Sequence, residues 1–189
     1  MTQLIDRTAV TRTAASQDAD TRIARLYETE IGRLTALGHL LTGDQSAAED
    51  LAQDVFIDLL TELRADADYL QGPPWAWLRT AMVHRAAKRF RFGTRELGRL
   101  MRFYEEERPV DDDWSATTID FQRAVAQLPA RMRACAVLKY TEDMTNEQIG
   151  EVLGCAAETV KTQLRRARPR LAELMGMEFH GADDEDDTR

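Results

Sequence analysis

The sequence predicts an all-α protein made of two small helical domains joined by an extended linker. Apolar residues recur every three or four positions in several separate stretches, which is the spacing of a helix with one buried face. No stretch alternates apolar and polar residues as a half-buried strand does. A segment of weak periodicity, acidic and interrupted by Gly93, Gly98 and Pro109, separates two groups of predicted helices.

These patterns divide the chain into five parts. Residues 1–20 mix Thr, Ala, Gln and Asp without a period, and we expect them to be disordered. A first helical domain is expected over 21–95, a linker over 96–117 and a second helical domain over 118–176. Residues 177–189 form an acidic tail, which we also expect to be disordered.

The composition indicates a soluble protein of a reducing compartment. Of the 189 residues 43% are apolar, and no window approaches the roughly 18 apolar residues of a membrane span. The two cysteines, Cys135 and Cys155, and three scattered histidines show no metal-ligand spacing, and no nucleophile–base pair or phosphate-binding glycine loop is visible. We therefore expect a cytoplasmic protein without membrane insertion, metal site, cofactor or enzymatic activity. Both cysteines are interpreted as small buried residues, with a redox role as the alternative for Cys155.

The net charge of −8 argues against a nucleic-acid partner until its distribution is considered. Residues 79–102 contain eight Arg and Lys against one Glu, and residues 158–170 contain five against one. The acidic residues gather elsewhere, in the linker and in the tail. Because binding to a polyanion depends on the charges at the contact, two local basic segments are compatible with DNA binding by an acidic chain.

Two helices are predicted at the start of the first domain. Helical spacing holds over 21–41 and Thr42-Gly43-Asp44 ends it, while Ser46 and Glu49 form a predicted capping box for a second helix that runs to about Leu63. One face of the second helix is apolar. The opposite face is polar apart from one isoleucine and carries Asp50, Gln53, Asp54 and Ile57. An isolated exposed apolar residue is common on surfaces, but it can also mark a contact with a partner protein.

A third, basic helix follows a predicted loop. Gly72-Pro73-Pro74 cannot continue a helix, and helical spacing resumes from Trp75 to about Phe92. Its basic residues share one face or flank it: Arg79, Arg85, Lys88, Arg89 and Arg91. With Trp75 and Trp77 at its start, the helix has the aromatic rings and cations that suit single-stranded nucleic acid. Alternatively, both tryptophans belong to the core.

The second domain ends in a predicted helix-turn-helix. Helices over 119–128 and 130–140 precede it. Thr145 and Gln148 predict a capping box, and Gly154 supplies the turn. The last helix buries Val160, Leu164, Ala167 and Leu171 and leaves polar residues outside: Thr159, Lys161, Thr162, Arg165, Arg166 and Arg168. Such a helix is suited to the DNA major groove. An ordinary helical hairpin with a solvated charged face is the alternative.

Two stretches together resemble the bacterial sigma factors of the extracytoplasmic-function (ECF) group. LTGDQSAAEDLAQDVFIDLL, continued by WAWLRTAMVHRAAKRFR, is similar to region 2 of that family. LPARMRACAVLKYTEDMTNEQIGEVLGCAAETVKTQLRRARPRL is similar to region 4, in which Leu-Pro-x-Arg, a middle Tyr and Gly-x-x-x-Thr-Val-Lys recur in this order.

The resemblance implies a transcription initiation factor that binds core RNA polymerase, through the β′ coiled coil and the β flap, and directs it to promoter DNA. It implies that Asp50, Gln53, Asp54 and Ile57 bind the polymerase. Residues that read and melt the −10 element would be Trp75, Trp77, Arg79, Arg85, Lys88, Arg89 and Arg91. Those that read the −35 element would be Thr159, Lys161, Thr162, Arg165, Arg166 and Arg168. Control by an anti-sigma factor is also implied.

Some residues depart from the family pattern. Ala156 stands where the family commonly has a capping Ser, which predicts a frayed start of the last helix. Pro169 is predicted to kink or end that helix. The loop sequence Gly72-Pro73-Pro74 also differs. A dimeric helix-turn-helix regulator is the alternative function, but it would not need the polar face around Ile57 or the second basic helix.

Overall fold

The computed structural model describes residues 3–93 and 116–176, with side-chain surroundings from 19 to 89 and from 120 to 176. Every regular element in these ranges is an α-helix, which confirms the predicted all-α class. The chain divides into two compact units, Met1–Arg89 and Phe90–Arg189. No helix in the described ranges is long and apolar enough to cross a membrane.

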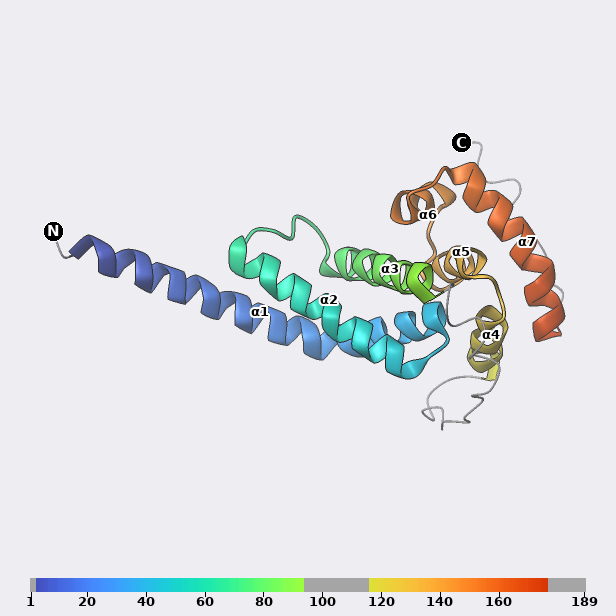
Figure 1. Ribbon diagram of the computed structural model, residues 1–189, viewed down its shortest axis with the longest axis horizontal. Helices are drawn as coiled ribbons and strands as arrows, with labels where there is room; N and C mark the ends of the chain where they lie inside the picture. The colour runs from blue at the N-terminus through green and yellow to red at the C-terminus, as the bar shows by residue number, and fades with distance from the viewer. Residues whose placement is uncertain (1–2, 94–115, 177–189) are drawn as a thin grey trace. The chain divides into compact units, whose positions relative to one another are not determined.

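The first unit consists of α1 (Gln3–Thr42), α2 (Gln45–Ala65) and α3 (Pro74–Gly93). The first two helices pack side by side in opposite directions, and the N-terminal part of α1 projects beyond the end of α2 (Figure 1). Gly43, with a positive φ of 74°, allows the tight reversal between them.

The prediction of disorder for residues 1–20 is wrong for the backbone, because α1 begins at Gln3. Extending an existing helix avoids the cost of nucleation, and Ala, Arg and Gln are good helix formers. The last of these residues are also anchored. Ala19 is buried, and the Asp20 carboxylate accepts two hydrogen bonds from Arg64 of α2, at 2.9 Å from Nε and 2.7 Å from Nη2.

The start of α2 also differs from the prediction. The N-cap is Asp44, whose carboxylate accepts a 2.7 Å hydrogen bond from the Ala47 amide, and Ser46 is not the cap. Asp44 directly follows the glycine that reverses the chain, so its side chain reaches the free amides first. The predicted partner Glu49 instead accepts a hydrogen bond from the Gln45 side chain at 2.7 Å.

Three helices meet at Gly38. A Cβ atom at this position would lie 3.1 Å from the Ala48 Cβ of α2 and 3.1 Å from the Met82 Cε of α3. The missing side chain therefore lets α1 approach both neighbours, and the three helices enclose one apolar core. Its fully buried members include Leu34, Val55, Leu59, Leu63, Leu78 and Met82.

The second unit consists of α4 (Ala116–Ala126), α5 (Ala130–Thr141), α6 (Asn146–Leu153) and α7 (Ala157–Met175), and α7 packs against the other three helices. Of the two predicted effects of Pro169, a kink or the end of the helix, the end is wrong, because α7 continues to Met175 and is capped by Gly176 at φ 61°. Leu171 is completely buried, so tertiary packing holds the turn after the proline although one backbone hydrogen bond is lost.

Candidate nucleic-acid interface

The helix-turn-helix forms as the sequence predicts. The Thr145 side chain accepts from the Gln148 amide at 3.3 Å, and the Gln148 side chain accepts from the Thr145 amide at 2.9 Å, which completes the capping box. Gly154 ends α6 in the left-handed region, at φ 64° and ψ 44°. Ala156 occupies the N-cap of α7 without a side-chain hydrogen bond, as predicted. These local features determine how α7 leaves the turn.

One face of α7 is buried and the opposite face is basic. Val160, Leu164, Ala167 and Leu171 form the buried face, which confirms the predicted stripe. Lys161, Arg165 and Arg166 are exposed, and Thr159 and Thr162 are half-buried beside them. Five of the six predicted DNA-reading residues therefore lie together along the accessible side of a helix that follows a tight turn.

Arg168 does not belong to the exposed basic face. Its side chain is half-buried, and Nε lies 3.4 Å from the Tyr140 hydroxyl of α5. Tyr140 in turn packs against Phe121 of α4, with the ring centroids 6.3 Å apart in an edge-to-face arrangement. Arg168 therefore borders the buried stripe and connects α7 to the helices beneath it.

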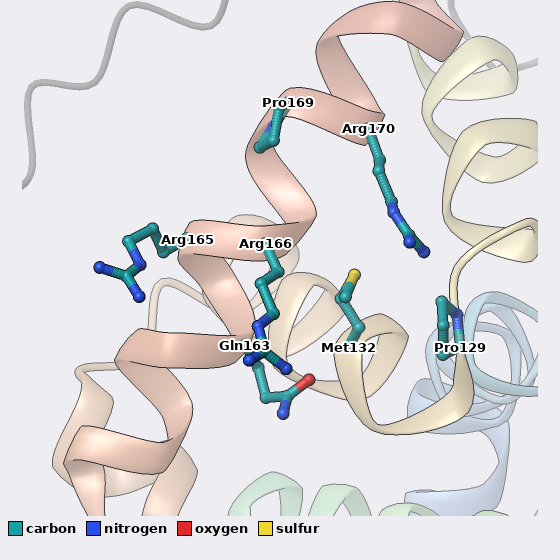
Figure 2. A pocket seen from close by; sticks show the side chains of 7 residues that line it. All are labelled: Pro129, Met132, Gln163, Arg165, Arg166, Pro169 and Arg170. Carbon is teal, nitrogen blue, oxygen red and sulfur yellow. The ribbon is translucent and has the colours of Figure 1, made fainter.

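A groove lies between the start of α5 and the middle of α7, with a volume of about 700 Å³. Figure 2 shows the Arg170 side chain extending from α7 towards the start of α5, whereas Arg165 extends away from the others. We call this feature the basic groove. Its lining residues are Pro129, Met132, Gln163, Arg165, Arg166, Pro169 and Arg170.

The basic helix of the first unit, α3, contributes fewer accessible cations than predicted. Lys88 and Arg89 are exposed, and Arg79 is half-buried. Arg85 is held by two carboxylates of α2: its Nη1 lies 2.8 Å from Asp54 Oδ2, and its Nη2 lies 2.5 Å from Asp58 Oδ2. The predicted phosphate ligand Arg85 is thus already paired. The side chain of Arg91 lies outside the described residues.

Both predicted stacking tryptophans are half-buried and in contact with other side chains. The Arg33 guanidinium of α1 lies 3.7 Å from the centre of the Trp75 ring. Trp77 donates from Nε1 to the Tyr69 hydroxyl at 3.3 Å, and the two rings meet edge to face at 6.1 Å. Both side chains therefore pack partly within the domain, in line with the alternative that the tryptophans belong to the core.

The predicted polymerase-binding face of α2 is accessible. Asp50, Gln53, Asp54 and Ile57 are all exposed, and Ile57 shows 61% of its surface. The buried stripe on the other side of α2 includes Leu51, Val55 and Leu59. An isoleucine this exposed, surrounded by polar groups, leaves most of its apolar surface unpacked within its own unit.

Several structural residues of these surfaces were missed by the sequence analysis. Asp58 and Arg33 act through contacts between helices distant in sequence, which spacing along one helix does not reveal. Arg133 donates to the carbonyls of Ala126 at 2.5 Å and Leu128 at 3.2 Å, and burial lowers its pKa. A sequence signal did exist for one missed residue, Gly150, because a glycine inside a helix often marks a close approach.

Gly150 brings the first helix of the helix-turn-helix against the turn. A Cβ atom at this position would lie 2.6 Å from the carbonyl oxygen of Cys155. The Cys155 amide also donates to the Gly150 carbonyl at 2.9 Å. Only glycine fits this arrangement without moving the backbone that leads into α7.

The two cysteines differ in their surroundings. Cys135 is buried, as predicted, and burial raises the pKa of its thiol to about 12. Cys155 is half-buried in the turn. No group of three or more potential metal ligands occurs among residues of the described ranges.

The first unit has an exposed polar face and a basic helix, and the second unit has a helix-turn-helix whose second helix is basic. Together they are typical of a DNA-binding transcription factor. Comparison with known families agrees: models described as Sigma-70 region 2 and Sigma-70, region 4 match residues 26–96 and 118–171. A dimeric regulator would not account for the region 2 match.

Curated relatives identify the family. ECF RNA polymerase sigma factor SigE of Mycolicibacterium smegmatis is 30% identical over 180 residues, covering 89% of this chain and 67% of the relative. SigW of Bacillus subtilis is 26% identical over 176 residues, covering 84% and 90%. The sigma factor RpoE of Bartonella quintana, solved in complex with the anti-sigma factor NepR, superposes with a TM-score of 0.61 at 25% identity, covering 81% and 96%.

The chain belongs to the ECF RNA polymerase sigma factors. It is accordingly a transcription initiation factor that associates with RNA polymerase and directs it to promoters.

Proposed function

We propose that α7 reads the −35 element with Lys161, Arg165 and Arg166, assisted by the hydroxyls of Thr159 and Thr162. The observation that carries this assignment is the exposed basic face of α7 directly after a capped and tightly turned α6. Arg and Lys suit guanine edges in the major groove, and hydroxyls suit phosphates. Arg168 takes a supporting role instead, because it packs at Tyr140.

We assign recognition of the −10 element to α3 and the loop before it. Lys88 and Arg89 are the exposed cations that phosphates of a separated strand would meet first. Arg85 positions α3 on α2 and contributes to DNA binding only if its carboxylate partners are displaced. Arg79, Arg91, Trp75 and Trp77 remain in this assignment, with the tryptophans lining the entry to the helix.

We assign polymerase binding to the exposed face of α2. Ile57 forms the apolar centre of this face, with Asp50, Gln53 and Asp54 around it. An apolar residue encircled by polar ones is the arrangement of a small protein–protein hot spot. The partner element is the β′ coiled coil, and region 4 contacts the β flap.

We propose that an anti-sigma factor controls this activity, that the chain is cytoplasmic, and that the polymerase itself carries out RNA synthesis. The structural relative from Bartonella quintana supports the first point, since it was solved with the anti-sigma factor NepR. An anti-sigma factor would act by covering α2 and α7, the two surfaces assigned above.

Run-off transcription with core polymerase tests the assignments separately. Ile57→Glu should abolish capture of core polymerase in a pull-down, since a carboxylate would have to be buried. Leu174→Glu is the matched control, because Leu174 is also an exposed apolar residue, at 40%, but lies at the end of α7. It should leave docking on the β′ coiled coil, measured with that coiled coil in isolation, unchanged.

The double variant Arg165→Ala, Arg166→Ala should bind core polymerase normally but lose initiation that depends on the −35 element, by about 10-fold or more for two lost cationic contacts. Normal capture by Ile57→Glu would refute the docking assignment, and normal initiation by the double arginine variant would refute the −35 assignment.

A further inference from the structure

The basic groove combines an apolar lining with exposed cations. Pro129, Met132 and Pro169 supply the apolar part, and Arg166 and Arg170 supply the charge. No ion pair between two described residues involves Arg165, Arg166 or Arg170. A segment that carries both apolar side chains and a run of carboxylates would satisfy both properties of the groove.

The chain itself contains such a segment directly after α7. Residues 177–189 read MEFHGADDEDDTR, with two apolar side chains, Met177 and Phe179, followed by five consecutive acidic residues, 183–187. This tail has six carboxylate side chains and one arginine. The groove offers the complementary features, an apolar surface at the start of α5 and arginines on α7.

We propose that this tail docks in the basic groove and competes with promoter DNA for Arg165 and Arg166. The inference rests on the assignment of these two arginines to the −35 element. It extends that assignment, because an acidic segment of the sigma factor itself would compete with DNA for the same arginines.

The tail is long enough to reach the groove. Gly176 adopts a left-handed conformation, which turns the chain away from the axis of α7. Arg170 lies six residues before Gly176, or about 9 Å along a helix. Asp183 lies seven positions after Gly176, a distance of up to about 25 Å when the chain is extended. The acidic run can therefore pass back along α7 to Arg170, Arg166 and Arg165.

The strength of the contact suits a competitor that DNA can displace. Each exposed ion pair contributes only a fraction of a kilocalorie to about 1 kcal/mol, but a tethered segment has an effective concentration on the order of millimolar. A DNA duplex that contacts the protein through many phosphates, and that the polymerase also holds, would displace such a tail. Random DNA contacts by the free chain would be suppressed.

Nuclear magnetic resonance of the full chain without DNA tests the docking itself. The first variant neutralises the acidic run in the tail: Asp183→Asn, Asp184→Asn, Glu185→Gln, Asp186→Asn and Asp187→Asn. A matched control removes five charges from the linker: Glu105→Gln, Glu106→Gln, Glu107→Gln, Asp111→Asn and Asp112→Asn. The Arg166 and Arg170 side-chain signals should shift in the tail variant and stay in place in the linker variant. Unchanged signals in the tail variant, or equal shifts in both, would overturn the proposal.

Binding of a labelled mixed-sequence DNA duplex at low salt tests the competition. Arg170 is outside the assigned reading residues, so Arg170→Gln should release the tail and raise the affinity about 2- to 5-fold, although a positive charge is lost. In the tail-neutralised chain the same substitution should give no increase. A decrease of equal size in both backgrounds would refute competition. Promoter-dependent initiation, measured with the Arg165 and Arg166 variants, separately reports whether the −35 assignment holds.

Discussion

The close approach at Gly150 makes a quantitative prediction about the helix-turn-helix. In Gly150→Ala the new Cβ would lie 2.6 Å from the backbone oxygen of Cys155, so the turn has to move. Such overpacking destabilises by about 1–3 kcal/mol, whereas alanine stabilises a helix by about 0.5–1 kcal/mol relative to glycine. We expect a net loss of about 1–2 kcal/mol in the stability of the second unit.

Hydrogen exchange followed by mass spectrometry measures this loss, because it separates peptides of α6 and α7 from those of the first unit. A loss of about 1–2 kcal/mol corresponds to exchange that is roughly 5- to 30-fold faster. Affinity for a −35 duplex should fall as well, since the turn sets the direction of α7.

Gly32→Ala provides the matched control. Gly32 also lies inside a helix, α1, but a Cβ at this position meets no atom within 4 Å. The same substitution should therefore stabilise α1 by about 0.5–1 kcal/mol and leave α6 and α7 unchanged. If Gly150→Ala exchanges as slowly as the unchanged chain, the inference that the turn requires a glycine is wrong.

Three further predictions follow from single contacts. Ala156→Ser should supply the missing cap of α7 and stabilise the second unit by about 1 kcal/mol in chemical denaturation. Asp58→Asn should loosen Arg85 from α2 more than Asp54→Asn does, since Asp58 accepts from both Nε and Nη2, and the larger drop in melting temperature checks this order. Burial lowers the pKa of His39, although Gln45 and Asp44 act in the opposite direction. Below about pH 6.5 the unfolded chain therefore binds a proton more readily than the folded chain, and stability should fall as the pH drops from 7 to 5. His39→Gln should flatten this pH dependence of the melting temperature.

The helix-turn-helix could be predicted from the sequence because its determinants are local. The Thr145 cap, the Gly154 turn and the buried stripe of α7 each depend on residues within one or two turns of each other. Periodicity and capping chemistry describe such short-range features well. The same reasoning placed Ile57 on the polar face of α2, where the structure has it exposed.

Contacts that depend on packing between helices could not be predicted from spacing along a single helix. Arg85 shares the basic spacing of α3 with Lys88 and Arg89, but it meets carboxylates of α2 that lie 27 and 31 residues earlier. Arg168 likewise shares the pattern of α7 and is found beside Tyr140, 28 residues away. Charge spacing on one helix shows which residues are basic. It does not show which of them a neighbouring helix has already paired.

The pairing of Arg85 bears on which residue dominates polymerase docking. Asp54 already has a cationic partner 2.8 Å away and remains 53% exposed, so exchanging that partner for a cation of the polymerase would gain at most a fraction of a kilocalorie to about 1 kcal/mol. Burying the exposed 61% of Ile57 gains more, about 1–2 kcal/mol, because full burial of an aliphatic side chain is worth about 1.5–3 kcal/mol. Ile57 should therefore supply most of the docking free energy on this face, while Asp54 sets the orientation. Asp54→Asn removes a charge from the proposed polymerase-binding face and also weakens the attachment of α3, so Arg85 links that face to the helix proposed to bind the −10 element.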